Sequence, residues 1–193
     1  MLGLKLATDP RWVNIVESNI EEILTDHAWC EQKAAYNAMH IIVNNSEKPE
    51  LVAEMIKIAR EEMEHFEMVH NIIQERGLKL GRDQKDDYVS DLMKFAKKDG
   101  SRNDVLIERL LFAALIEARS CERFRILSQN IKDPTLAKFY HDLMVSEAGH
   151  YTTFIKFAKQ YTEKVDVDKR WNEWLVYEAE IMKKYGKKET VHG

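Results

Sequence analysis

Two short stretches of the sequence share one spacing of glutamate and histidine. The first is EEMEH at Glu61–His65, and the second is SEAGH at Ser146–His150. In each stretch a glutamate precedes a histidine by three residues, and in an α-helix this spacing puts the carboxylate and the imidazole on one face, one turn apart. Such a pair can bind a metal ion. The fold prediction therefore rests on the segments around these two stretches.

Both stretches lie in long segments whose apolar residues recur at helical spacing. Polar turns near Ser46 and Asp133, each followed by a proline, divide these segments into two consecutive antiparallel hairpins. Gly77 is predicted to cap the second helix at its C-terminus. The four long helices are predicted over 19–43, 49–76, 103–131 and 134–161.

The remaining segments predict smaller elements. Asp9 and Pro10 are typical of a helix start, so a short helix is expected to end near Ser18. The other predicted elements are a minor helix within the crossover 78–102, a last amphipathic helix over 168–185, and a disordered tail over 187–193. Two hairpins joined by a long crossover predict an all-α, ferritin-like four-helix bundle with an extra C-terminal helix, as a single domain over 1–193.

The first arm of each hairpin supplies a further carboxylate at a matching height. Glu31 lies 31 residues before Glu62, and Glu117 lies 30 residues before Glu147. Residues equally far from the turn of an antiparallel hairpin lie at the same level. Four glutamates and two histidines form the ligand set of carboxylate-bridged di-iron or di-manganese bundles. The predicted catalytic metal ligands are Glu31, Glu62, His65, Glu117, Glu147 and His150.

Several alternatives stay open at this point. Glu122 competes with Glu117, but it lies only about ten residues from its turn and on another helix face, so Glu117 is favoured. His27, four residues before Glu31, either supports that carboxylate or is a satisfied core histidine. Cys121 fits a buried apolar thiol better than a pocket residue. A plain helical bundle without metal would have to bury several unpaired carboxylates.

The composition limits the class of protein and the compartment in which it is expected to work. The net charge of −4 predicts no strong global attraction to nucleic acid, and 45% hydrophobic residues are typical of a globular protein. Two cysteines without a C-x-x-C pair exclude a rubredoxin-type site and suit a reducing compartment. Residues 1–11 lack the apolar core of a signal peptide, and no apolar run approaches the ~20 residues of a membrane span. We expect a cytoplasmic monomer that contacts no membrane.

Four strings of the sequence resemble those of a known family, in order over about Asp9 to Tyr161. They are DHAWCEQKAA at 26–35, AREEMEHFE at 59–67, IEARSCERF at 116–124 and SEAGHY at 146–151. By these strings the chain is similar to the bacterial tRNA 2-methylthio-isopentenyladenosine hydroxylases, and the string with Glu-Ala-Arg-Ser-Cys-Glu-Arg-Phe is the most specific. One departure is Gly149, where the family tends to carry arginine; this residue is no ligand.

The resemblance implies a tRNA-modifying monooxygenase. Its reaction would be the oxygen-dependent hydroxylation of the isopentenyl group of a modified adenosine beside the anticodon. The implied cofactor is a non-haem centre of two iron ions, supplied with electrons by a partner such as a ferredoxin or a flavin reductase. The alternative function is a ferroxidase or peroxidase of the ferritin and rubrerythrin type. A third possibility is a metal-free helical adaptor.

An acidic protein that binds tRNA needs a local basic surface, because phosphate contacts come from lysine and arginine. Two clusters are candidates, and the crossover is preferred because long connections are often functional. The crossover cluster comprises Lys79, Arg82, Lys85, Lys94, Lys97, Lys98 and Arg102; the other comprises Lys156, Lys159, Lys164, Lys169 and Arg170.

Overall fold

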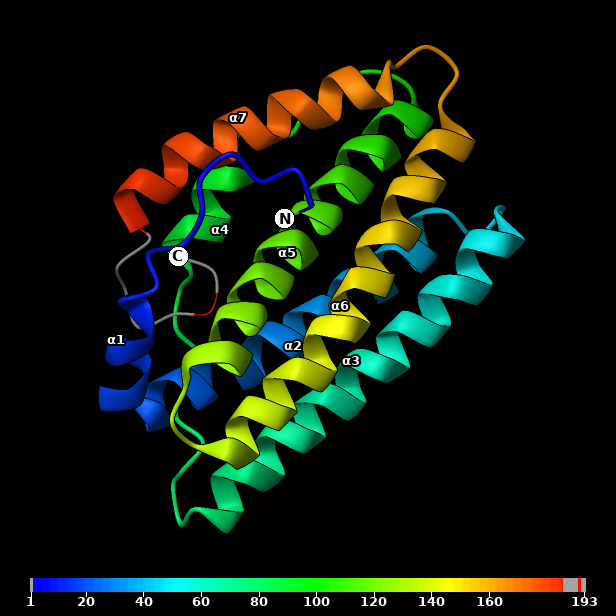
Figure 1. Cartoon of the computed structure of the whole chain (residues 1–193). Helices are drawn as coiled ribbons and strands as arrows, with labels where there is room; N and C mark the ends of the chain where they lie inside the picture. Colours follow the sequence, from blue (N-terminus) through cyan, green and yellow to red (C-terminus); the bar gives the residue numbers. More distant parts are fainter. Residues whose placement is uncertain (1, 186–190, 192–193) are drawn as a thin grey trace. The chain divides into compact units, whose positions relative to one another are not determined.

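The computed structural model describes residues 2–185 and residue 191. Seven α-helices and no β-strand occur among these residues. Figure 1 labels the helices along the chain. Most of the predicted tail, 187–193, lies outside the described residues. The helices are α1 (Trp12–Ser18), α2 (Ile20–Asn44), α3 (Pro49–Glu75), α4 (Asp87–Leu92), α5 (Arg102–Asn130), α6 (Pro134–Tyr161) and α7 (Val167–Tyr185).

The chain divides into two compact units, and each contains one of the predicted hairpins. Among the described residues, the α5–α6 unit comprises 2–17 and 86–185, and the α2–α3 unit comprises 18–85 and 191. The prediction of a single domain stays a prediction. None of the helices in the described part of the chain is long and apolar enough to cross a membrane.

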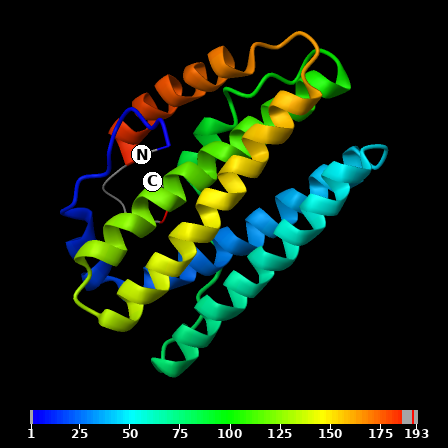
Figure 2. The same cartoon turned by 45° about the vertical axis from the view of Figure 1, so that its right-hand side comes forward.

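In the α2–α3 unit, two long helices run antiparallel through a short turn at 45–48 (Figure 2). Gly77 has a φ of +67° and ends α3, as the sequence predicted. The chain after Gly77 then returns along α2. Trp29 donates its indole N–H to the carbonyl of Gly81 at 3.0 Å, and Gly81 donates its amide to Thr25. The first part of the crossover is therefore attached to this unit.

In the α5–α6 unit, α5 is buried on nearly every face and forms the centre. Helix α6 lies antiparallel beside it, and α4 and α7 pack against each other (Figure 2). Ser101 and Asp104 form a capping box at the start of α5, and Asp133 caps α6. Helix α1 begins at Trp12 rather than at Pro10, since Pro10 and Arg11 form a turn.

Candidate metal centre

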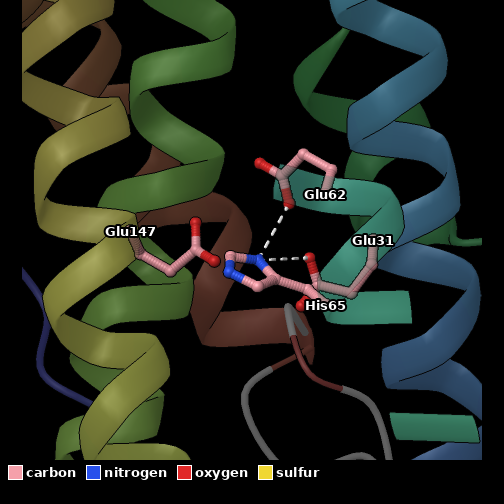
Figure 3. A group of neighbouring side chains, drawn as sticks. All are labelled: Glu31, Glu62, His65 and Glu147. Atoms are coloured by element: carbon pink, nitrogen blue, oxygen red, sulfur yellow. Dashed lines mark hydrogen bonds and ion pairs between the residues drawn. The ribbon is translucent and has the colours of Figure 1, made fainter. Parts of the chain in front are cut away.

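Helices α2 and α3 bring three of the predicted ligands together. Glu31, Glu62 and His65 are buried, and each offers one ligand atom within 4.8 Å of those of the others. The Nδ1 atom of His65 lies 3.4 Å from Glu62 Oε2 and 3.8 Å from Glu31 Oε2, so the imidazole faces both carboxylates (Figure 3). These three residues are here called the α2–α3 triad.

Helices α5 and α6 bring together the other three. Glu117, Glu147 and His150 are buried, with ligand atoms within the same 4.8 Å of one another. The Nδ1 atom of His150 lies 3.5 Å from Glu147 Oε2. These residues are called the α5–α6 triad. Each unit thus holds two carboxylates and one imidazole at one level of its hairpin.

The local sequence explains both triads. A spacing of three residues puts Glu62 and His65, and likewise Glu147 and His150, on one helix face. The turns at 45–48 and 131–133 then fold Glu31 and Glu117 back to the same height. All six predicted residues therefore lie where the hairpin spacing put them, three in each unit.

The electrostatics of the α2–α3 triad favour a cation. Burial by itself would raise the pKa of Glu31, but the hydrogen bond with His27 and the nearby imidazole of His65 outweigh it and lower that pKa below its usual range. An ionised buried carboxylate is costly unless positive charge accompanies it. Two carboxylates and one imidazole are oxygen and nitrogen donors that iron or manganese accepts. The residues present therefore fit a metal ion.

Glu122, the rival to Glu117, lies in a different cluster. Its carboxylate accepts hydrogen bonds from the Thr8 amide at 3.0 Å, the Thr8 hydroxyl at 2.7 Å and Arg119 Nη1 at 2.9 Å. Glu122 therefore fixes the N-terminal segment to α5, and it is absent from the groups of possible ligands found among the described residues. Sequence reasoning did not anticipate this role.

A buried ionic network surrounds Arg119, and the sequence analysis missed it. Arg119 Nη2 lies 2.6 Å from Glu178 Oε1 on α7, and the hydroxyl of Tyr88 donates to the same oxygen at 3.0 Å. Burial raises the pKa of Glu178, and the charge of Arg119 offsets only part of this increase. The network joins α4, α5 and α7 with the N-terminal segment. Its one sequence signal was the close spacing of Arg119, Glu122 and Arg123 in the middle of the long helix α5.

The structure changes the membership of the two basic clusters that the sequence predicted as tRNA-binding surfaces. Arg170, which the sequence grouped with exposed lysines, is buried, and its guanidinium bonds both oxygens of Glu108 at 2.7 and 2.9 Å. It is therefore not available to phosphate. The crossover cluster divides between the units, with Lys79, Arg82 and Lys85 in the α2–α3 unit and the other four residues in the α5–α6 unit.

Comparisons with known proteins agree with the resemblance found in the sequence. Residues 2–193 match the family described as tRNA-(MS[2]IO[6]A)-hydroxylase (MiaE). A tRNA 2-(methylsulfanyl)-N(6)-isopentenyladenosine(37) hydroxylase from Pseudomonas putida is 35% identical over 160 residues, which cover 83% of this chain and 77% of that protein. The enzyme of the same name from Salmonella typhimurium is 29% identical over 153 residues, which cover 75% of this chain and 55% of that protein.

A solved structure is also similar. It is a protein from Synechococcus with aldehyde deformylating oxygenase activity, 30% identical, with a TM-score of 0.90 over 98% of this chain and 95% of that one. This likeness confirms the predicted all-α, ferritin-like fold class. The match over nearly the whole sequence confirms the resemblance as well. The chain belongs to the tRNA-(MS[2]IO[6]A)-hydroxylase family.

Proposed function

We propose that this protein hydroxylates the isopentenyl group of a modified adenosine next to the tRNA anticodon, using dioxygen and a carboxylate-bridged di-iron centre. The observation that carries this function is the buried Glu, Glu, His triad in each hairpin of a chain that belongs to a tRNA hydroxylase family. Both curated relatives are named for an activity on this modified adenosine.

The proposed metal ligands are the six residues of the two triads. Ferritin-like carboxylate proteins take one glutamate from each of two helices and a Glu-x-x-His pair from each of the other two, which is the set present here. Two iron ions bound by these residues would activate dioxygen toward a carbon–hydrogen bond that has no acidic proton. The ligands are Glu31, Glu62, His65, Glu117, Glu147 and His150.

The protein residues would position the substrate beside the metal ligands and keep water away from the reacting carbon. The allylic carbon of an isopentenyl group offers no acidic proton, so side-chain acid–base chemistry alone cannot hydroxylate it. Ala35, Ala113 and Ala114 are buried near Glu31 and Glu117 in sequence, and their methyl groups leave more room beside the carboxylates than larger side chains would. Apolar surroundings also keep bulk water from the reacting atoms.

The proposed reaction needs an electron donor. One oxygen atom of dioxygen enters the substrate and the other leaves as water, which consumes two electrons and two protons beyond the substrate. A ferredoxin or a flavin reductase would supply these electrons. We place the reaction in the cytoplasm and propose that a single-domain monomer carries it out. The target base lies in the anticodon loop, where it is unpaired, so the enzyme can splay it out of its stack.

For tRNA docking we propose one end of the α5–α6 unit. Arg170 Nη2 donates to the carbonyl of Phe95 at 2.9 Å and so attaches the start of α7 to the crossover, and Asn103 donates to Glu163 in the loop after α6. The second half of the crossover and the segment after α6 therefore meet. The exposed lysines gathered there, here called the basic end, are Lys97, Lys98, Lys164 and Lys169.

Two acidic residues of that end, Asp166 and Glu173, are engaged within the protein. The pKa of Glu173 is lowered, first by its hydrogen bond with Arg170 and then by the charges of Lys97 and Lys169. Asp166 accepts the amide of Lys169 at the start of α7. Exposed lysines whose acidic neighbours Glu173 and Asp166 are engaged by protein groups favour contact with a polyanion.

The decisive experiment is mass spectrometry of tRNA nucleosides. A strain without the gene should accumulate the non-hydroxylated nucleoside, and the purified iron-loaded protein with a reductase should convert it. Unchanged nucleosides in the deletion strain would contradict the proposal. Iron oxidation and peroxide reduction, assayed on the same preparation, test the ferroxidase and peroxidase alternatives.

A further inference from the structure

Two half-buried aromatic side chains meet where α7 begins beside α6. The ring centroids of Tyr151 on α6 and Trp171 on α7 lie 5.7 Å apart, and the ring planes are inclined at 52°. The rings are therefore tilted and not stacked face to face. Lys159 Nζ pairs with Asp168 Oδ1 at 2.6 Å and so attaches the start of α7 to the last part of α6. Tyr151 and Trp171 are here called the aromatic pair.

Another half-buried pair of rings in this unit already has stacking partners. Phe95 and Tyr177 lie nearly parallel, at 9° with 4.4 Å between centroids, and the guanidinium carbon of Arg170 lies 4.2 Å from the Phe95 ring centroid. These rings are stacked within the protein, whereas Tyr151 and Trp171 are partly exposed and do not stack on each other. Partly exposed aromatic rings of this kind can stack on an unpaired nucleic-acid base.

The aromatic pair lies one helical turn from a proposed metal ligand. Tyr151 follows Glu147 by four residues on α6, a spacing that puts both side chains on one helix face, about 6 Å apart along the axis. Aromatic side chains of helices lean toward the helix N-terminus, which is the direction of Glu147. A base held by this ring would therefore lie next to the α5–α6 triad.

The aromatic pair also adjoins the basic end. Trp171 follows Lys169 by two residues, about 3 Å along the axis of α7. Burial raises the pKa of Tyr151, and the nearby Trp171 and the positive charge of Lys159 offset part of this increase. The aromatic pair is therefore placed between lysines that can contact phosphates and a glutamate that can bind metal.

We propose that Tyr151 and Trp171 form a stacking platform that holds the unpaired modified adenine of the anticodon loop beside the metal ligands. This inference rests on the proposed tRNA hydroxylase function and adds to it the residues that hold the base. The lysines of the basic end contact phosphates, and the aromatic pair contacts the face of the base. The isopentenyl group extends from the edge of the base, which stacking leaves uncovered.

The test measures whether RNA binding depends on the base and on an aromatic ring at position 171. Iron-loaded protein is titrated with two anticodon stem–loop RNAs, of which one carries the isopentenyl adenosine and the other lacks the base at that nucleotide. Trp171→Leu keeps an apolar side chain without a ring, whereas Trp171→Phe keeps a ring. Tyr36→Ala removes an exposed tyrosine of α2 and is the control.

The parent protein and Tyr36→Ala should bind the complete RNA about 5–150-fold more tightly than the RNA without the base. Trp171→Leu should lose most of this ratio through weaker binding of the complete RNA. Its salt dependence should not change, because no phosphate contact is removed. Trp171→Phe should retain most of the ratio. An unchanged ratio in Trp171→Leu would overturn the platform, as would equal losses in the Leu and Phe variants or equal weakening toward both RNAs.

Two checks keep the outcomes separate. Circular dichroism and iron analysis establish that each variant is folded and keeps its metal. Tyr151→Leu and Tyr151→Phe are a second matched pair, and they carry the same test if Trp171→Leu is not folded. Failure of the parent protein to bind either RNA would contradict the proposed tRNA substrate itself. Equal binding of both RNAs by the parent would contradict only the stacking platform.

Discussion

Glu122 on α5 holds Thr8 of the N-terminal segment through both of its carboxylate oxygens, at 3.0 Å to the amide and 2.7 Å to the hydroxyl. The two residues are 114 positions apart in sequence. The same carboxylate pairs with Arg119, one helical turn before it. Glu122, which the sequence offered as an alternative ligand, is thus engaged by protein groups through both of its carboxylate oxygens.

This arrangement separates Glu122 from Glu117 experimentally. Glu117→Ala should abolish or strongly reduce iron binding, because it removes one carboxylate of the α5–α6 triad. Glu122→Ala should leave the iron content unchanged but lower the melting temperature, since it leaves Arg119 with one fewer buried partner. Metal analysis and thermal unfolding of both variants provide the check. Loss of iron in Glu122→Ala alone would reverse the assignment.

Each histidine of the triads should account for one metal position. We expect about two irons per chain in the parent protein, by the ligand set of such bundles. His65→Ala should weaken the position that it shares with Glu31 and Glu62, and His150→Ala should weaken the other. Elemental analysis after dialysis against a weak chelator measures the loss. Full occupancy by two irons in both variants would sink the ligand assignment.

The network around Arg119 should dominate the stability of the α5–α6 unit. Arg119→Met leaves the carboxylates of Glu178 and Glu122 buried without their cation, which typically costs about 3–5 kcal/mol. Chemical denaturation measures the change in the free energy of unfolding. Arg109→Met, at a half-buried position of the same helix, is the matched control and should cost much less. Similar losses in the two variants would show that the network contributes little.

The two cysteines should differ strongly in reactivity. Burial, with the charge of Glu147, raises the pKa of the Cys121 thiol to about 11, so at pH 8 only about one thiol in a thousand is ionised. Cys30 is half-buried and should react first with a thiol reagent. Cys30→Ser should remove the fast phase, and Cys121 should react faster as the pH rises toward 11 or after unfolding. Rapid labelling of Cys121 in the folded protein at pH 8 would contradict this expectation.

Charge reversal should locate the tRNA surface. Changing Lys97, Lys98 and Lys169 to glutamate should weaken tRNA binding and reduce its salt dependence by about one power of salt concentration per lost phosphate contact. The iron content should not change. Lys57→Glu on α3, a residue already paired with Glu54, is the control. If the triple variant binds tRNA like the parent across a salt series, the basic end is not the docking surface.

The sequence by itself determined what local periodicity controls. Helix limits, the Gly77 cap and the levels of Glu31 with Glu62 and of Glu117 with Glu147 all follow from 3.6 residues per turn and from the position of two turns. These quantities depend on neighbours within one hairpin. Residue spacing could therefore predict the helix limits and the ligand levels, and the strings shared with the family supported the same ligand assignment.

Only the tertiary structure decided the roles of the other buried charges. Glu122, Arg119 and Arg170 each carry a charge that a sequence reader would place at a ligand site or on the surface, yet each is buried against partners more than 50 residues away. Such pairings offset the cost of burying a charge, but no local pattern encodes them, because the partners come from segments far apart in the sequence. Packing between distant segments therefore decided which charges are structural.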